Sequence, residues 1–429
     1  MGRKVRVAID LGCYEFKGIV FEIVDVKDTI HVLAAKKEVA GGLDDGKIVN
    51  VAALKKQLSQ MLNALSEEAG VEIDEVYLSI PPSNAYQNNI VKSAVVADSS
   101  GSVSLTNMHV SELTERILNE IKRKSENEKY TLIDFFVNEY SFAPDSKSPL
   151  QIIEKPEGVS AYSLGIDIFF VMGLNYVIST LEQIFEDLYV FCDKITVPFV
   201  PGGFKAVPYK ARKEGALYID MGSSFTNAVI FKNNSVIHSY SLPIGGSTVT
   251  TDLIRAFGKT LDDENLQLAE KIKKKNNNLI IEADDSRRNV YMDRDLLSDC
   301  FLTLEQVKLI MRERVEEILN LVKEEIKKNP SIDTGAYDFE QVILSGGTAK
   351  FVGIDEVARG IFNKPVKVAT PYIDSGVSIE ELNSPEYVTV YGLAEYFAAG
   401  MRKPSLNSGF LQRLKGKLRT IFNKRKGDV

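Results

Sequence analysis

The fold is decided by the stretch Val7-Ala-Ile-Asp-Leu-Gly-Cys-Tyr-Glu-Phe-Lys-Gly-Ile-Val-Phe21, because the second half of the chain repeats it as Leu217-Tyr-Ile-Asp-Met-Gly-Ser-Ser-Phe-Thr-Asn-Ala-Val-Ile-Phe231. Each copy predicts a buried strand, a tight glycine turn and a second apolar strand. A weaker echo pairs Val76–Ser79 with Val342–Ser345. The period of this repeat is too long for a solenoid. The sequence therefore predicts an α/β fold with two similar halves that face each other.

Length and composition are those of a globular protein with several folding units. The chain has 429 residues, of which 44% are hydrophobic and 26% charged, and this excludes disordered and collagen-like classes. The net charge of −7 argues against a global nucleic-acid binder. The few scattered cysteines and histidines predict neither a disulfide framework nor a zinc site. Since no secretory signal and no apolar run of about 20 residues is present, we expect a cytoplasmic protein.

Helices and two inserts are predicted between the repeated strands. Apolar residues at helical spacing predict helices over 52–69, 110–124, 175–191 and 304–328, and Thr303 with Gln306 predicts a capping box before the last one. A turn-rich stretch and a charged helical stretch read as insertions into the two halves. The predicted boundaries are 1–83, 84–163 (insert), 164–206, 207–247, 248–331 (insert), 332–384, 385–400, a linker over 401–409 and a terminal helix over 410–427.

The two Asp-x-Gly turns predict a phosphate site. A strand fixes each carboxylate, and each glycine turn brings backbone N–H groups close to a polyphosphate, so two such loops can grip one nucleotide from both sides. Asp10 and Asp220 would then hold Mg²⁺, with water between. The alternative is that Asp-x-Gly only ends a strand, which two aligned copies make less favoured. The predicted phosphate-loop residues are Asp10, Gly12, Cys13, Tyr14, Lys17, Asp220, Gly222, Ser223, Ser224 and Thr226.

Weaker signals predict where the nucleoside lies. Gly346 and Gly347 follow an apolar strand and would let the backbone approach a base or ribose. Glu270 and Lys273 share one helical face and could bracket the ribose and base, although a solvated surface pair is the alternative. The pair Gly245-Gly246 is a similar weak signal. The stretch Gly41–Ile48 resembles a Walker loop but lacks its Ser or Thr, so we interpret it as a surface turn.

The last residues predict an amphipathic helix that binds a membrane surface. At about 100° per residue, six apolar side chains share one arc of about 120°. Residues 402–427 hold nine Lys or Arg and no acid, which leaves −16 on the remainder of the chain. Such a helix suits anionic lipid headgroups, while docking on a protein or on RNA is the alternative. The predicted membrane-binding residues are Phe410, Leu411, Leu414, Leu418, Ile421 and Phe422.

At these motifs the chain resembles the actin/Hsp70/sugar-kinase superfamily, and most closely the FtsA family of bacterial cell-division actin homologues. The resemblance matches Asp10–Gly12 and Asp220–Gly222 to the two phosphate loops, Lys17 to the family's lysine and Val342–Gly347 to its adenosine motif. It implies an actin-like (ribonuclease H-like) duplicated fold with an FtsA-type 1C insert. It also supplies names for the predicted divisions: 1A for 1–83, 164–206 and the return helix 385–400, 1C for 84–163, 2A for 207–247 and 332–384, and 2B for 248–331.

The chain departs from the family in both loops. Ser223, Ser224 and Phe225 stand at the family's Gly-Gly-Thr places, and Asn227 replaces an Asp. In the first loop, Cys13 and Tyr14 replace small hydroxyl residues. Backbone N–H groups donate most phosphate contacts, so we expect ATP or ADP with Mg²⁺ to bind. Since no catalytic residue can be named, we expect slow or undetectable hydrolysis.

The resemblance implies a function in cell division. It implies self-association into filaments, tethering of the tubulin-like division protein FtsZ through its C-terminal tail, and attachment to the cytoplasmic face of the membrane at the division site, with no nucleic acid bound. A diverged paralogue of FtsA fits the altered second loop as well. One alternative is a pilus-assembly scaffold of the PilM type. A sugar or acid kinase of the same superfamily is another, but it needs a catalytic carboxylate that the sequence does not place.

Overall fold

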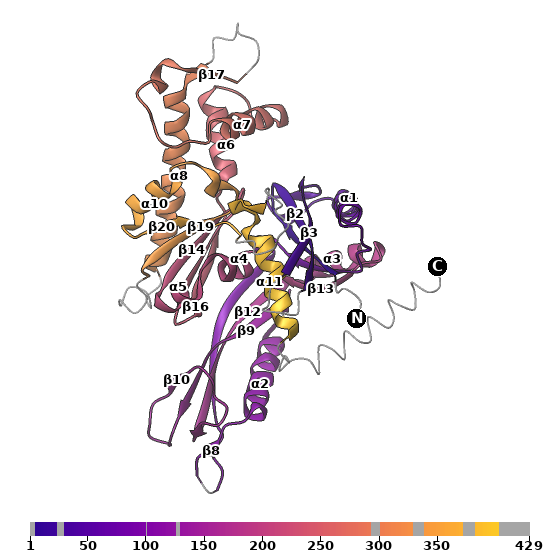
Figure 1. Ribbon diagram of the computed structural model, residues 1–429, viewed down its shortest axis with the longest axis vertical. Helices are drawn as coiled ribbons and strands as arrows, with labels where there is room; N and C mark the ends of the chain where they lie inside the picture. The colour runs from indigo at the N-terminus through magenta and orange to yellow at the C-terminus, as the bar shows by residue number, and fades with distance from the viewer. Residues whose placement is uncertain are drawn as a thin grey trace.

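The computed structural model describes residues 5–23, 30–99, 101–125, 129–292, 301–328, 339–371 and 382–402. Figure 1 shows two sheets that lie side by side, with an inserted sheet extending from one end of the molecule and a helical unit from the other. No helix in the described part of the chain is long and apolar enough to cross a membrane.

The first half is a five-stranded mixed sheet in the order β13-β6-β1-β2-β3. β1 and β2 form an antiparallel hairpin in which Asp10 lies in register with Lys17, and β6 runs parallel to β1 on the other side. The strands are β1 (Val5–Leu11), β2 (Glu15–Ile23), β3 (Ile30–Val39), β6 (Glu75–Ser79) and β13 (Phe191–Thr196).

The second half repeats this order with β20-β19-β14-β15-β16. β14 and β15 are again an antiparallel hairpin, in which Asp220 lies in register with Asn227, and β19 runs parallel to β14. Each strand of one sheet thus has an equivalent in the other, so the predicted duplication into two similar α/β halves is confirmed. The strands are β14 (Ala216–Met221), β15 (Thr226–Lys232), β16 (Ser235–Leu242), β19 (Gln341–Ser345) and β20 (Val366–Val368).

Helices cover both faces of the first sheet. α1 (Val51–Ala69) begins at an Asn50 cap and ends at Gly70 in the left-handed conformation, and its apolar stripe packs on the sheet together with α3. α11 (Val388–Arg402) covers the opposite face. α3 (Asn175–Asp187) ends earlier than the predicted 191, because Phe191 already begins β13. Two short helices, α4 (Phe199–Ala206) and α5 (Tyr209–Glu214), lead into the second half.

The first insert is a four-stranded antiparallel sheet in the order β10-β9-β12-β7, with α2 packed on one face (Figure 1). β12 begins at the predicted end of this insert and continues its sheet to Leu174. The predicted domain boundaries stay predictions. The elements are β7 (Ala85–Val95), α2 (Asn107–Ser125), β9 (Tyr130–Ala143), β10 (Gln151–Ile153) and β12 (Ser163–Leu174), with the short pair β8 (Val103–Ser104) and β11 (Ser160–Ala161).

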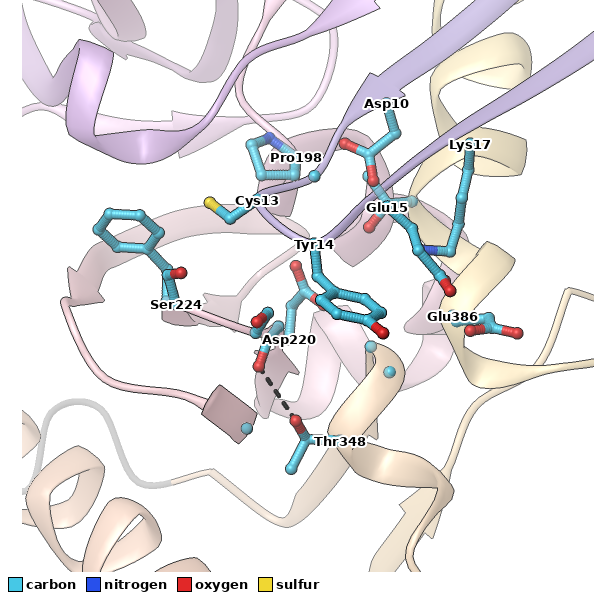
Figure 2. Close-up of a pocket in the computed structure, with 18 of the residues that line it drawn as sticks. Asp10, Cys13, Tyr14, Glu15, Lys17, Pro198, Asp220, Ser224, Thr348 and Glu386 are labelled. Atoms are coloured by element: carbon cyan, nitrogen blue, oxygen red, sulfur yellow. Dashed lines mark hydrogen bonds and ion pairs between the residues drawn. The ribbon is translucent and has the colours of Figure 1, made fainter. Parts of the chain in front are cut away.

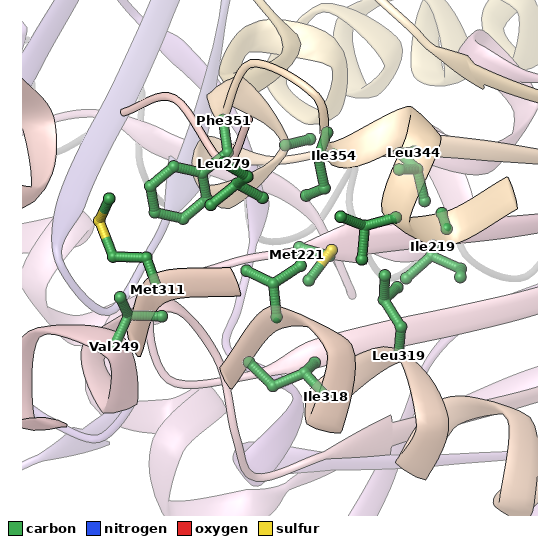
Figure 3. Close-up of a cluster of buried hydrophobic side chains, with 14 of the residues drawn as sticks. Ile219, Met221, Val249, Leu279, Met311, Ile318, Leu319, Leu344, Phe351 and Ile354 are labelled. Carbon is green, nitrogen blue, oxygen red and sulfur yellow. The ribbon is translucent and has the colours of Figure 1, made fainter. Parts of the chain in front are cut away.

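A helical unit packs on the second sheet through one apolar core. Figure 3 shows Ile219, Met221 and Leu344 of the sheet against Ile318 and Leu319 of α8. The predicted capping box of α8 is confirmed, because Thr303 N donates to Gln306 Oε1 at 2.8 Å and Gln306 N to Thr303 Oγ1 at 3.2 Å. The elements are α6 (Gly246–Ala256), α7 (Asp263–Lys275), β17 (Asn289–Tyr291), β18 (Phe301–Thr303), α8 (Leu304–Lys328) and α10 (Ile354–Phe362).

Candidate functional site

A cavity of about 350 Å³ lies between the two halves, at the turns that end β1 and β14. Figure 2 shows Asp10 and Lys17 of the first half facing Asp220, Ser224 and Thr348 of the second. The duplicated hairpins therefore bring both predicted phosphate loops to one site. The predicted residues that line it are Asp10, Gly12, Cys13, Tyr14, Lys17, Asp220, Gly222, Ser223, Ser224, Gly246, Glu270, Lys273, Gly346 and Gly347.

The first loop is too tight for any side chain at Gly12. A Cβ there would lie 2.5 Å from the Glu15 carbonyl oxygen, so glycine is required for the turn. Asp10 stands at the end of β1 and accepts a hydrogen bond from the Ser79 hydroxyl of β6. Burial raises the pKa of Asp10, against the opposing effects of Lys17 and Ser79.

The second loop has the same construction. Gly222 N donates to the Phe225 carbonyl at 2.9 Å, and a Cβ on Gly222 would lie 3.0 Å from that oxygen. Asp220 accepts from the Asn227 side-chain amide at 3.3 Å. Burial, and next the charge of Asp10, raise the pKa of Asp220 to about 6. Two carboxylates that line one cavity disfavour each other's ionised form.

The donors around this carboxylate pair suit Mg²⁺. Asp10 and Asp220 are buried acids whose raised pKa values a divalent cation would relieve, and carboxylate oxygens are its preferred ligands. Among the described residues, no group of three or more His, Cys, Asp or Glu is arranged to hold a metal. Two carboxylates with water and phosphate oxygens completing the shell therefore fit Mg²⁺ better than a cage made only of protein ligands.

The Lys17 ammonium is mostly buried, and the one ion pair it forms in the described part of the chain is long. Its side chain is 11% exposed, and its nearest described acid is Glu15, with Nζ 3.8 Å from Oε2. Within the described part of the chain it makes no hydrogen bond. A buried ammonium at the wall of a cavity that also contains backbone N–H turns is suited to a phosphate.

The N-terminus of α6 supports the second loop. Gly246 N donates to the Gly222 carbonyl at 2.9 Å, and Ser247 N donates to that of Ser223 at the same distance. Thr348 Oγ1 donates to the Gly222 carbonyl at 3.0 Å (Figure 2). The positive end of a helix dipole at this place favours an anion in the cavity.

Glu270 and Lys273 lie in the cavity wall on α7. Their side chains are 14% and 13% exposed, so the alternative of a solvated surface pair is wrong. Lys273 Nζ lies 2.5 Å from Glu270 Oε2 and donates to the Gly246 carbonyl at 3.0 Å and to Thr250 Oγ1 at 2.9 Å. Burial lowers the pKa of Lys273, against the opposing effect of Glu270.

Gly346 and Gly347 differ in what surrounds them. Gly346 has φ +91°, and a Cβ there would lie 2.5 Å from the Met221 carbonyl oxygen and 2.6 Å from Asp220 Oδ1. A Cβ on Gly347 would meet nothing within 4 Å. The first glycine is therefore needed by the fold, whereas the second leaves open space at the cavity wall.

Two predicted site residues lie behind the cavity wall. Thr226 is fully buried on β15 and donates to the Ile244 carbonyl at 2.8 Å. A Cβ on Gly245 would lie 2.5 Å from the Ser223 carbonyl oxygen, so this residue packs against the second loop. The predicted membrane-binding residues lie outside the described residues. All these assignments stay predictions of function.

Sequence reasoning missed a second charged cluster in the wall. The Glu386 Oε1 atom lies 3.2 Å from Lys37 Nζ and 3.1 Å from Lys350 Nζ. Burial opposes ionisation of Glu386, but Lys17, Lys350 and Lys37 outweigh it and lower its pKa. Its position just before α11 carried no motif, so only the fold reveals it. The prolines at 81, 82 and 198 complete the wall, with Pro198 beside Asp10 and Cys13 (Figure 2).

The duplicated sheets and the cavity between them define an actin-like protein. Solved structures support this class: the chain is similar to the "PilM-PilN type IV pilus biogenesis complex", with TM-score 0.62, 14% identity, and 92% of this chain and 99% of that one covered. It is also similar to MreB5 of Spiroplasma citri bound to ADP, with TM-score 0.51, 14% identity, and coverage of 93% and 98%.

Sequence comparisons then specify the relatives. The family model described as "Cell division protein FtsA" matches residues 217–392. Cell division protein FtsA of Buchnera aphidicola subsp. Acyrthosiphon pisum (strain APS) is 25% identical, covering 92% of this chain and 91% of the relative. That of Helicobacter pylori (strain J99 / ATCC 700824) is 26% identical, with coverage of 93% and 83%. The predicted resemblance is confirmed: this chain is similar to FtsA cell-division proteins.

Proposed function

We propose that this chain is an ATP-binding, actin-like cell-division protein that self-associates and tethers FtsZ to the cytoplasmic membrane. The observation that carries the nucleotide part is the convergence of two equivalent Asp-x-Gly turns on one cavity, with the Lys17 ammonium among them. The turns would cradle the phosphates with Mg²⁺ between Asp10 and Asp220, and Glu270 and Lys273 would flank the nucleoside. The role in division rests on the FtsA relatives.

We expect slow or undetectable hydrolysis from the composition of the wall. A general base must be able to accept a proton from water near the terminal phosphate. Glu386 is a poor base, because the lysines around it lower its pKa. The prolines at 81, 82 and 198 have no titratable group. Nucleotide would therefore act as a bound ligand that holds the two halves together, and ADP and ATP would both fit this role.

Attachment to lipid is proposed from the sequence of the tail. The basic, amphipathic stretch 410–427 would lie in the interface, with its apolar arc in the acyl region and its cations on anionic headgroups. The remaining −16 of charge on the body would be repelled by the same surface, so the body would stand off on the 401–409 linker. The contact with the FtsZ tail is proposed at 248–331 from the resemblance alone.

Three experiments test these parts separately. Titration calorimetry of the full chain with Mg-ATP should show saturable heat, and no heat at millimolar ligand would refute nucleotide binding. Co-sedimentation with anionic liposomes should recover the full chain and leave a chain truncated before Phe410 in the supernatant. If truncation leaves liposome binding unchanged, the tail has no such role. An FtsZ C-terminal peptide added to the liposome-bound protein should sediment with it.

A pilus-assembly scaffold is the second candidate, because the fold is similar to the PilM–PilN complex. That type docks a peptide of a membrane partner rather than lipid, so liposome binding without any protein partner separates the two functions. A sugar or acid kinase is the least favoured candidate. It requires a carboxylate base facing the terminal phosphate. The lysines around Glu386 lower its pKa and make it a poor base, and we assign Asp10 and Asp220 to Mg²⁺ and Glu270 to the nucleoside.

A further inference from the structure

One contact crosses the rim of the cavity from one half to the other. The Lys274 ammonium of α7 lies 4.6 Å from the centre of the Tyr14 ring and 3.4 Å from its hydroxyl oxygen. Tyr14 belongs to the first phosphate loop, which takes no part in the core of the second half. A lysine over an aromatic face at this distance is an attractive cation–π contact.

Carboxylates from both halves hold Lys274 in this position. Its Nζ lies 3.6 Å from Glu270 Oε1 on its own helix and 3.9 Å from Glu15 Oε1 on β2 of the other half. Partial burial opposes the charged form of Lys274, but Glu270, Tyr14 and Glu15 outweigh it and raise its pKa. Lys274 is therefore a cation at neutral pH and is shared between the halves.

A second contact crosses between the halves beside the first. The Ser224 hydroxyl of the second loop donates to Asp45 Oδ1 at 2.9 Å. Asp45 lies at the tip of the hairpin of β4 (Leu43–Asp44) and β5 (Lys47–Ile48), the stretch interpreted from sequence as a surface turn. This turn therefore belongs to the first half and reaches the second loop.

The exposure of the side chains indicates that the Tyr14–Lys274 contact lies on the solvent side of the cavity. Asp10 is half-buried and Asp220 is buried, whereas Tyr14 is 38% exposed and the Lys274 side chain is 55% exposed. A ligand held between the two loops would therefore lie inward of the Tyr14–Lys274 contact. This contact joins the two halves at the solvent side of the cavity and would hinder the ligand from leaving on that side.

We propose that Tyr14 and Lys274 form a latch across the rim of the cavity that retains bound nucleotide, with release limited by its opening. This inference rests on the proposed nucleotide binding and adds the regulation of that site. Tyr14 stands where the resemblance leads us to expect a small hydroxyl residue in the first loop. It makes the residence time of the nucleotide depend on a contact that touches no phosphate.

The test is the rate at which radiolabelled ATP leaves the full chain when excess unlabelled ATP is added. Lys274→Met should speed release about 3- to 10-fold, as expected for one part-exposed cation–π contact with its ion pairs. Lys274→Arg retains the charge and should release at nearly the original rate. Lys275→Met, one residue further on the same helix, removes an equal charge outside the latch and is the control.

Tyr14→Phe separates the ring from the hydroxyl. It keeps the aromatic face for Lys274 and should speed release less than Tyr14→Leu does, which a purely steric or folding defect would not reproduce. If ATP binds but Lys274→Met and Lys275→Met release it at the same rate, the latch is refuted while the binding proposal stands. If the unmodified chain loses labelled ATP as fast as Lys274→Met does, the latch is refuted, whereas absence of heat in the Mg-ATP titration would refute nucleotide binding itself, and the latch with it.

Discussion

Asp220 lies in register with Asn227 across the β14–β15 hairpin, and the Asn227 amide donates to the Asp220 carboxylate at 3.3 Å. The equivalent pair in the first half is Asp10 with Lys17. The two hairpins thus carry different charges at equivalent positions. Each has a carboxylate, but only the first has an ammonium, that of Lys17, opposite it. Asn227 is itself fixed by the Ser241 hydroxyl, which donates to its side-chain oxygen at 2.7 Å. Phosphate binding should therefore depend on the first half more than on the second.

Replacement of Lys17 by Met tests this asymmetry. Lys17 is the buried ammonium that the cavity offers to a phosphate, and a hydrogen bond to a charged group contributes about 1.5–3 kcal/mol, so affinity for Mg-ATP should fall about 10- to 100-fold. Calorimetry measures the change, with melting curves to verify folding. Lys56→Met, an exposed position on α1, is the control. Equal affinity of the Lys17 variant and the parent would exclude a phosphate contact.

The raised pKa of Asp220 predicts how stability changes with pH. Its pKa is about 6 in the folded chain, against about 3.9 for an ordinary aspartate, so between about pH 4 and 6 the folded state holds a proton that the unfolded chain releases. The free energy of unfolding should therefore fall as pH rises through this window. Asp220→Asn stays neutral and should lack this fall, which is on the order of 2 kcal/mol.

Denaturant unfolding of the nucleotide-free protein from pH 4 to 7 measures the difference between parent and variant, in which the titrating groups that do not interact with Asp220 cancel. Asp134 is another acid whose pKa is raised by burial, to about 6. Asp134→Asn should therefore remove a separate part of the fall in the free energy of unfolding. Asp263→Asn, exposed on α7, is the control and should follow the parent. If the free energy of unfolding changes with pH equally in Asp220→Asn and in the parent, the predicted contribution of Asp220 is wrong.

Substitutions at Gly346 and Gly347 test separately what the fold requires and what the nucleotide contacts. Gly346→Ala would place a Cβ against the Met221 carbonyl and the Asp220 carboxylate at positive φ, so we expect a loss of at least about 1–3 kcal/mol of stability. Gly347→Ala meets open space and should leave the melting temperature unchanged. If the nucleoside lies against Gly347, this variant should still lose affinity for ATP. Unchanged affinity in a stable Gly347→Ala protein would move the nucleoside elsewhere.

The parts of the site that the sequence predicted are those encoded locally. An apolar strand followed by Asp-x-Gly is a pattern within a few residues, and its repetition at Asp10 and Asp220 predicted both loops and their convergence. The capping box at Thr303 and Gln306 is equally local. In each case the spacing along the chain determines the contact, so no knowledge of distant segments is needed.

The parts that were missed depend on distant segments. Lys37, Lys350 and Glu386 come together only after the two sheets and α11 have packed, and each is a common residue type at an ordinary place. Thr226 was placed in the site because it follows the second loop, but strand alternation turns its side chain into the core. The helix predicted to reach 191 had a continuous apolar stripe, yet Phe191 joins β13 by pairing with Glu75.

Membrane binding by the tail makes a prediction that depends on the face of the helix. Leu418 lies at about 80° on the wheel, within the apolar arc, whereas Thr420 lies at about 280°, outside it. Leu418→Gln removes a side chain whose burial in the interface is worth roughly 1.5–3 kcal/mol, so liposome affinity should fall about tenfold or more. Thr420→Gln makes an equally neutral change on the other face and should bind nearly as the parent does.

Co-sedimentation at several lipid concentrations gives both affinities, and added salt should weaken parent and variants alike because the basic residues remain. Equal losses for the two variants would mean that the stretch does not bind as an amphipathic helix.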